Sequence, residues 1–157
     1  MIQRYLPNPK LSHTCAYSIS GNKIYDHEKF PHITITRPGE LSMFNINEFI
    51  QEYNKFLNHP TSFVVIGYKK LGTKNCLIVD FINDELKENA LKIHRKYGQK
   101  ERCNKYFYTP TFHIAIKNKT IEELRNLFPQ NETFFKAESI YIRQEGEGHP
   151  RMGELIF

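Results

Sequence analysis

The sequence lacks any apolar run of the roughly 20 residues that a membrane-crossing helix needs. Residues 1–4 show no apolar core of a secretory signal. Cysteine is scarce: Cys15, Cys76 and Cys103 are odd in number and widely spaced, which argues against a disulfide scaffold and against a zinc motif. No linker or low-complexity stretch divides the chain, so residues 1–157 are expected to form one soluble, cytoplasmic domain.

The composition is that of a folded, basic protein. Hydrophobic residues make up 39% of the chain and aromatic residues 13%, which excludes a disordered polymer. The formal net charge is +5 and the isoelectric point is near 9.0. Such a charge suits an anionic partner, and we expect RNA or a nucleotide rather than a membrane.

Two histidine-headed segments in opposite halves of the chain dominate the pattern: residues 31–36 (PHITIT) and 112–117 (FHIAIK). Side chains of an extended strand alternate between its two faces. The isoleucines of both segments are therefore expected to point into a core. The opposite faces are expected to carry His32, Thr34 and Thr36 in the first segment, and Thr111, His113, Ala115 and Lys117 in the second.

Two imidazoles facing one groove can act as one acid and one base, because the ordinary pKa of histidine lies near neutrality. A neutral ring can take a proton from an attacking hydroxyl or water while a protonated ring gives one to the leaving oxygen. Cleavage of a phosphodiester also needs donors to the non-bridging oxygens. The Thr34 hydroxyl can donate in this way, Ala115 cannot, and Thr36, Thr111 or Lys117 can cover that loss by binding substrate.

The two segments resemble the repeated signature of the two-histidine (2H) phosphoesterases, the group that includes 2′-5′ RNA ligase-like proteins and cyclic phosphodiesterases. That signature is a His, an apolar residue, a Thr or Ser, and another apolar residue. Residues 32–35 match it fully, and residues 113–116 match it except at Ala115.

The expected order of elements is similar to that of the family from about residue 13 onward, with one difference. Only a short polar connector fits residues 23–30, where the family commonly has a helix. Strands are predicted at 13–20, 31–36, 62–69, 76–82, 111–117, 137–142 and 151–157, and helices at 46–57, 84–97 and 121–128. The expected N-terminal caps of these helices are Asn45 or Asn47, Asp84, and Thr120. A His strand, a helix and a strand pair thus occur at 31–82 and again at 111–157. This order predicts an α+β, two-lobed fold of antiparallel sheets with outer helices.

The resemblance implies a phosphodiesterase that acts on a ribose 2′-linked phosphodiester without metal or other cofactor. His32 and His113 would be the general acid and base, with Thr34 beside them. Tyr141 and Arg143 are candidates for substrate contacts by family analogy. Candidate substrates are 2′,3′-cyclic phosphate ends, 2′-5′ oligoadenylate and cyclic nucleotide messengers. Separately, the Ile-, Asn- and Lys-rich composition suits a phage, a virus or a low-GC bacterium as the source, and a phage or viral source would favour destruction of a host defence signal.

Two other interpretations stay open. Ala115 favours a binding module of the same shape that holds RNA or a nucleotide without cutting it. The strand histidines can also be incidental, with the basic surface serving another partner. A basic and aromatic stretch, residues 92–108, can bind and stack a polynucleotide, or it can be a solvated helix face followed by ordinary strand residues.

Overall fold

The fold is α+β: six strands form one antiparallel sheet with three α-helices, in a computed structural model that describes residues 13–39, 45–98, 110–144 and 155–156. The strands are β1 (His13–Ser20), β2 (His32–Gly39), β3 (Ser62–Leu71), β4 (Lys74–Phe81), β5 (His113–Ala115) and β6 (Phe134–Gln144), with the short β7 (Leu155–Ile156) added on β6. The helices are α1 (Ile46–Phe56), α2 (Asp84–Tyr97) and α4 (Ile121–Leu127), and a 3₁₀ turn, η1, covers Ile24–Asp26.

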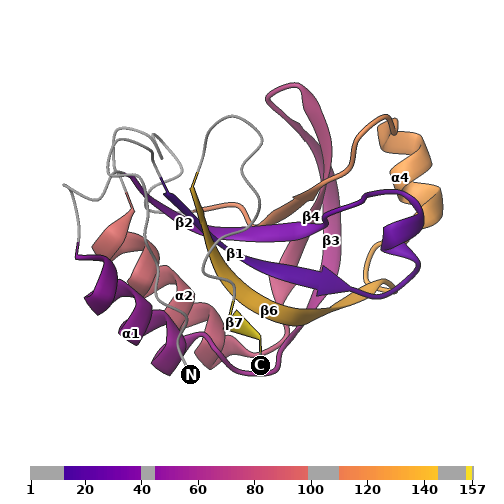
Figure 1. The fold of residues 1–157 in the computed structure, drawn as a ribbon. Helices are drawn as coiled ribbons and strands as arrows, with labels where there is room; N and C mark the ends of the chain where they lie inside the picture. Colours follow the sequence, from indigo (N-terminus) through magenta and orange to yellow (C-terminus); the bar gives the residue numbers. More distant parts are fainter. Residues whose placement is uncertain (1–12, 40–44, 99–109, 145–154, 157) are drawn as a thin grey trace.

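The strand order β2-β1-β6-β3-β4-β5 places both histidine-headed strands at the edges of the sheet. These two edge strands, β2 and β5, also contact each other. The sheet is therefore curled, as Figure 1 shows, and its two ends approach one another. His32 and His113, 81 places apart in the sequence, come from strands that meet in space.

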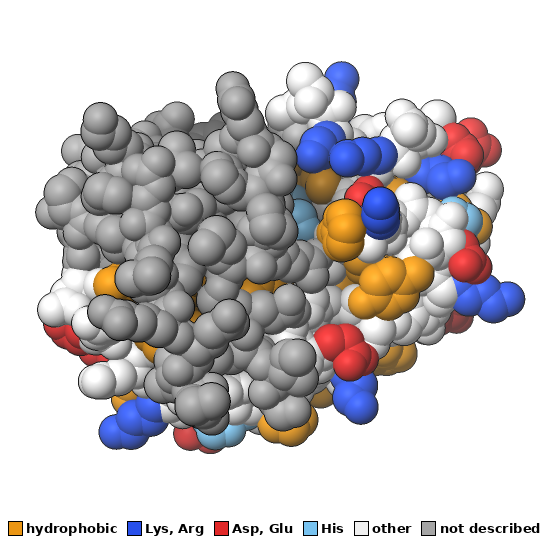
Figure 2. All heavy atoms as spheres, viewed as in Figure 1, with side chains coloured by type: hydrophobic (Ala, Val, Ile, Leu, Met, Phe, Trp, Pro, Cys, Tyr) orange, Lys and Arg blue, Asp and Glu red, His pale blue; other side chains and the backbone are white. Residues whose placement is uncertain are grey.

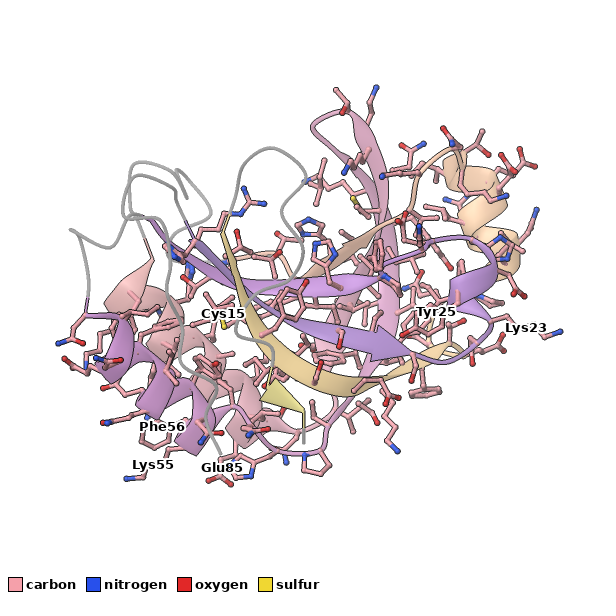
Figure 3. All side chains as sticks on the ribbon, viewed as in Figure 1. Cys15, Lys23, Tyr25, Lys55, Phe56 and Glu85 are labelled. Carbon is pink, nitrogen blue, oxygen red and sulfur yellow. The ribbon has the colours of Figure 1, made fainter. Side chains whose placement is uncertain are left out.

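The helices cover different parts of this sheet. α2 packs on β2 and β4, α1 packs on α2, and α4 packs on β3 and β4, so that α4 lies apart from the other two helices (Figure 1). Local sequence starts each helix: Asn45 caps α1 by accepting from the Glu48 N–H, and Thr120 and Glu123 form a capping box on α4. In Figure 3, Lys55 and Phe56 mark the C-terminal end of α1, which lies far from Tyr25 of η1.

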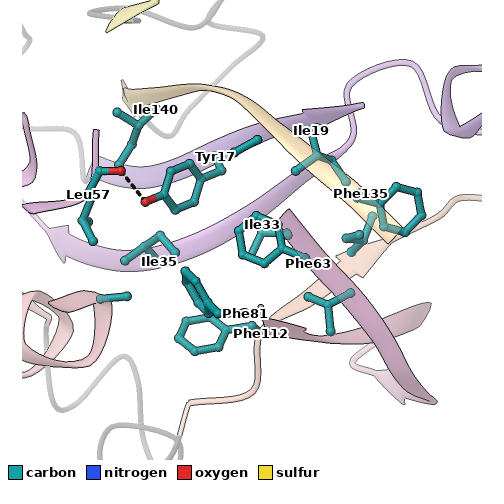
Figure 4. Packing of buried hydrophobic residues seen from close by; sticks show 14 of the residues in the cluster. Tyr17, Ile19, Ile33, Ile35, Leu57, Phe63, Phe81, Phe112, Phe135 and Ile140 are labelled. Atoms are coloured by element: carbon teal, nitrogen blue, oxygen red, sulfur yellow. Dashed lines mark hydrogen bonds between the residues drawn. The ribbon is translucent and has the colours of Figure 1, made fainter. Parts of the chain in front are cut away.

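Aromatic rings join the two ends of the sheet in one core (Figure 4). Phe81 of β4 contacts Phe63 and Phe112 with ring centroids 4.8 and 5.0 Å apart, and Tyr17 of β1 at 6.4 Å. The Tyr17 hydroxyl donates to the Leu57 carbonyl at 2.6 Å, which ties β1 to the end of α1. The apolar members of the alternating segments, Ile33, Ile35, Ile114 and Ile116, are buried as the pattern predicts.

Several boundaries differ from the sequence-based predictions. Asn83, not Asp84, caps α2, since its side chain accepts from the Leu86 N–H while Asp84 is the first helical residue. The predicted strand at 111–117 is paired only over His113–Ala115, and β2 continues through the expected stop at 37–39. Much of the 92–108 stretch and of the 151–157 strand lies outside the described residues.

The two predicted runs of strand, helix and strand pair are present as β2-α1-β3-β4 and β5-α4-β6-β7. They share one continuous sheet, and no clear two-lobed duplication follows from its pairing. In the described part of the chain, no helix combines the length and the apolar character needed to cross a bilayer.

Candidate active site

His32 and His113 occupy equivalent local positions, each at the first residue of an edge strand. The Nδ1 atom of His32 lies 3.0 Å from the carbonyl oxygen of Phe30, and that of His113 lies 2.8 Å from the carbonyl oxygen of Thr111. In both cases the acceptor is two residues upstream. The same backbone geometry therefore holds both rings.

This contact determines which nitrogen of each ring carries the proton. A carbonyl oxygen only accepts, so Nδ1 carries the proton and donates it. The neutral ring then has its lone pair on Nε2, and the protonated ring has its exchangeable proton there. Proton transfer by either ring would therefore use Nε2, with the ring's orientation held by Nδ1.

Beside His32, the register of β2, β1 and β6 sets up two rows across the sheet. His32 pairs with Ser18, which pairs with Ser139, and the Ser18 and Ser139 hydroxyl oxygens are 2.5 Å apart. The next row on the same face is Thr34, Ala16 and Tyr141. Thr34 therefore neighbours His32 as the alternation predicts, and Tyr141, 2% exposed, is two strands away.

A pocket of about 240 Å³ lies between the two edge strands. Most of its polar lining residues come from β2 or from the chain at the start of β5, and one comes from α2. They are Thr34, Thr36, Arg37, His94, Thr111 and His113. His32 is outside this lining, two places before Thr34 on β2. The pocket is thus lined by both His113 and Thr34, whereas half-buried His32 neighbours Thr34 without lining the pocket.

The pKa of His113 is lowered below its ordinary value, chiefly because burial disfavours the charged ring. The positive charge of Arg37 lowers this pKa further, and the bond to the Thr111 carbonyl acts in the opposite direction. At neutral pH the ring is accordingly neutral, with an available lone pair on Nε2. His113 is suited to accept a proton.

Thr36 departs from the alternation because β2 carries a bulge. Ala16 pairs with Thr34 but Cys15 pairs with Thr36, which leaves Ile35 as an extra residue. Thr36 is 1% exposed, and its Oγ1 lies 3.1 Å from Nδ1 of His94 on α2. Past the bulge, Thr36 therefore no longer follows the simple alternation expected from His32 and Thr34, yet it lines the same pocket as Thr34.

The remaining predicted substrate contacts are placed unevenly. Thr111 lines the pocket, whereas Lys117 lies beyond it, in a second hollow at the end of β5. Arg143 belongs to β6 and pairs with Thr14, but its side chain is outside the described part of the structure. Ala115 is half-buried and follows His113 on the same strand face.

His94 and Arg37 were not predicted as site residues. His94 is 4% exposed and occupies the buried face of α2 with Ala90 and Tyr97, at spacings of four and three residues. A polar residue on that apolar stripe was the available signal. Arg37 had none, because only the curl of the sheet brings it near His113.

Among the described residues, no three His, Cys, Asp or Glu side chains come together as a metal site would need. The sequence matches no protein-family model, and it matches no curated protein.

Proposed function

We propose that this chain is a phosphodiesterase of the two-histidine type, working without metal on a ribose 2′-linked phosphodiester of RNA or a nucleotide. One observation carries the proposal: the two rings have the same Nδ1 contact to the carbonyl two residues upstream, on edge strands that contact each other. The proposal requires that the two Nε2 atoms, which come from opposite ends of one curled sheet, face the same phosphate.

The strand order supports a duplicated site. Read from either end, β2-β1-β6 and β5-β4-β3 each run from a histidine-headed edge strand to the middle of the sheet. On this proposal the two halves correspond to the two lobes of the resembled family. The departure at Ala115 affects only the second half.

In this proposal His113 is the base, which its lowered pKa supports. His113 Nε2 takes a proton from the attacking water as the water oxygen bonds to phosphorus. His32 gives the proton on its Nε2 to the ribose oxygen as the phosphorus–oxygen bond breaks. Thr34 and Arg37 supply a hydroxyl and a positive charge to the non-bridging oxygens, and Arg37 compensates for the hydroxyl missing at Ala115.

The test is turnover of 2′,3′-cyclic nucleotides, 2′-5′ oligoadenylate and cyclic dinucleotides in the presence of EDTA. His32→Ala and His113→Ala are each expected to lower kcat by about 10²–10⁴-fold, the usual contribution of a general acid or base. His59→Ala is the matched control, because His59 is exposed at the end of α1. Full turnover in His113→Ala would contradict the proposal.

A second candidate is a binding module that holds the same ligands without cutting them. Ala115 favours it, since loss of one donor to the developing charge costs on the order of 10²-fold or more in rate. Tight binding of a 2′-linked nucleotide with no turnover, weakened in both histidine variants, would support the module. If no nucleotide binds or reacts, the histidines are incidental.

A further inference from the structure

A second hollow lies at the far end of β5 from His113. Its volume is about 420 Å³, and its polar lining includes Thr73, Lys74, Lys117, Asn118, Lys119 and Thr120. Three lysines, Lys74, Lys117 and Lys119, thus contribute to the lining of one hollow. The candidate active site does not use them.

The register connects this hollow to His113. On the paired strands β4 and β5, His113 lies opposite Ile78 and Ala115 opposite Cys76. The same register, continued by the bond from the Ile116 N–H to the Asn75 carbonyl, places Lys117 opposite Lys74. Lys74 therefore lies on the strand face that His113 shares with Ile78, four residues or about 13 Å further along β4, and Lys117 lies in the turn that follows β5.

The hairpin joining β3 to β4 also borders both sites. Leu71 and Gly72 line the pocket of His113, and the next residues, Thr73 and Lys74, line the hollow. Figure 2 shows Lys and Arg side chains over the region of this hairpin and α4. Consecutive residues of one hairpin thus border both sites.

The charge balance of the hollow favours an anion. Lys74 and Lys117 are exposed, and within the described ranges no carboxylate lies at ion-pair distance from either. Two carboxylates, Glu28 and Glu123, also lie beside the hollow, so its three lysines exceed the neighbouring acids by one charge. Glu28 accepts from the Lys117 backbone N–H at 3.1 Å, and Glu123 belongs to the capping box and lies 3.9 Å from the Lys119 ammonium.

We infer that this hollow binds a second phosphate of the substrate, so that the preferred substrate is a linear oligonucleotide rather than a cyclic mononucleotide. The inference rests on the proposed function for the position of the scissile phosphate. A 2′,3′-cyclic mononucleotide has one phosphate, which cannot occupy both sites. Lysines bind backbone phosphates as point charges and make no contact that distinguishes one base from another. The hollow therefore gives a preference for substrate length but not for base sequence.

The experiment measures binding, so that it does not depend on turnover. A fluorescent, uncleavable 2′-deoxy tetranucleotide is titrated by anisotropy against the intact chain, the double variant Lys74→Gln/Lys117→Gln, and the control Lys55→Gln/Lys136→Gln, which removes two exposed lysines elsewhere. The Lys74/Lys117 variant is expected to bind at least tenfold more weakly. The slope of log K against log salt concentration should fall by about 0.7 for each phosphate that the variant no longer neutralises.

Three outcomes decide the matter. Weaker binding and a smaller salt slope in the Lys74/Lys117 variant alone support the site, even if no substrate is ever cleaved and the proposed phosphodiesterase fails. An equal effect in the control variant overturns the site and leaves the catalytic proposal standing. A competition experiment compares an acidic peptide with an unlabelled tetranucleotide of the same charge. If both displace the labelled tetranucleotide at the same concentration, the hollow is not a phosphate site and the inference is overturned.

Discussion

The two histidines owe their chemistry to backbone atoms close to them in sequence. Each Nδ1 is bound to a carbonyl two residues upstream, so the ring orientation depends on the extended conformation at the strand start. A local contact of this kind is available to any histidine in that position. What distinguishes His113 is its environment: burial and the charge of Arg37 both lower its pKa.

The first prediction concerns Arg37→Gln. The positive charge at Arg37 disfavours the protonated His113 ring, and its removal is expected to raise the pKa of His113. A base with a higher pKa becomes neutral only at higher pH, so the acid limb of the kcat/KM profile should move to higher pH. The His113 ring protons, followed by NMR through a pH titration, report the same shift without substrate.

The control is Lys136→Gln, which removes an exposed charge on β6 that does not line the pocket. It should leave the titration of His113 where it is. An unchanged titration in Arg37→Gln would show that the two groups do not interact. A shift to lower pH would mean that Arg37 stabilises the charged ring instead.

The C-terminal end of α2 packs closely against β2 beside the candidate active site. Gly98 ends this helix, and a Cβ at this position would lie 2.5 Å from the His94 carbonyl oxygen and 2.9 Å from Thr36 Oγ1. The first neighbour is backbone and cannot rotate away. Glycine is therefore required where α2 closes over β2.

Gly98→Ala is expected to lower the free energy of unfolding by about 1–3 kcal/mol, the usual cost of overpacking a close contact. The measurement is urea denaturation followed by circular dichroism. Because the clash reaches Thr36 and His94, turnover should also fall under folding conditions. Gly67→Ala is the control, since the only contact of its added Cβ is with Ile78 at 4.0 Å. Equal stability of the two variants would contradict the packing argument.

Element positions follow closely from sequence patterns. The helical spacing of apolar residues and the capping residues predicted α1 and α4, because these signals act within one or two turns. For α1 the sequence allowed Asn45 or Asn47 as the cap, and the structure has Asn45. The prediction that Asp84 caps α2 was wrong by one residue, because Asn83 and Asp84 are both good capping residues and the structure uses Asn83. The bulge that moves Thr36 had no local signal, because a bulge is a property of the pairing with β1.

In the molecule as a whole, one aromatic core holds both ends of the sheet. Phe81 contacts Tyr17 of β1, Phe63 of β3 and Phe112 before β5. The approach of β2 to β5, and with it the candidate active site, therefore depends on packing that spans the sheet.

Phe81→Ala is expected to cost about 3–5 kcal/mol of stability, as for other buried aromatic residues. Phe134→Ala is the matched control, because Phe134 is 49% exposed and should lose far less. Denaturant midpoints give the comparison. In Phe81→Ala, the NMR signals of His32 and His113 should lose their folded dispersion together. Loss at only one histidine would show that the two ends of the sheet fold independently.

The order of strands and helices, the buried isoleucines and the two histidine motifs could be read from the sequence, since each depends on local periodicity or on the chemistry of a side chain. Only the tertiary structure decided which residues share a pocket. The curl of the sheet, set by strand pairing and core packing, brings Arg37 to His113, adds His94 to the lining and moves Lys117 to a separate hollow. These contacts join residues distant in the chain, and local pattern carries no information about them.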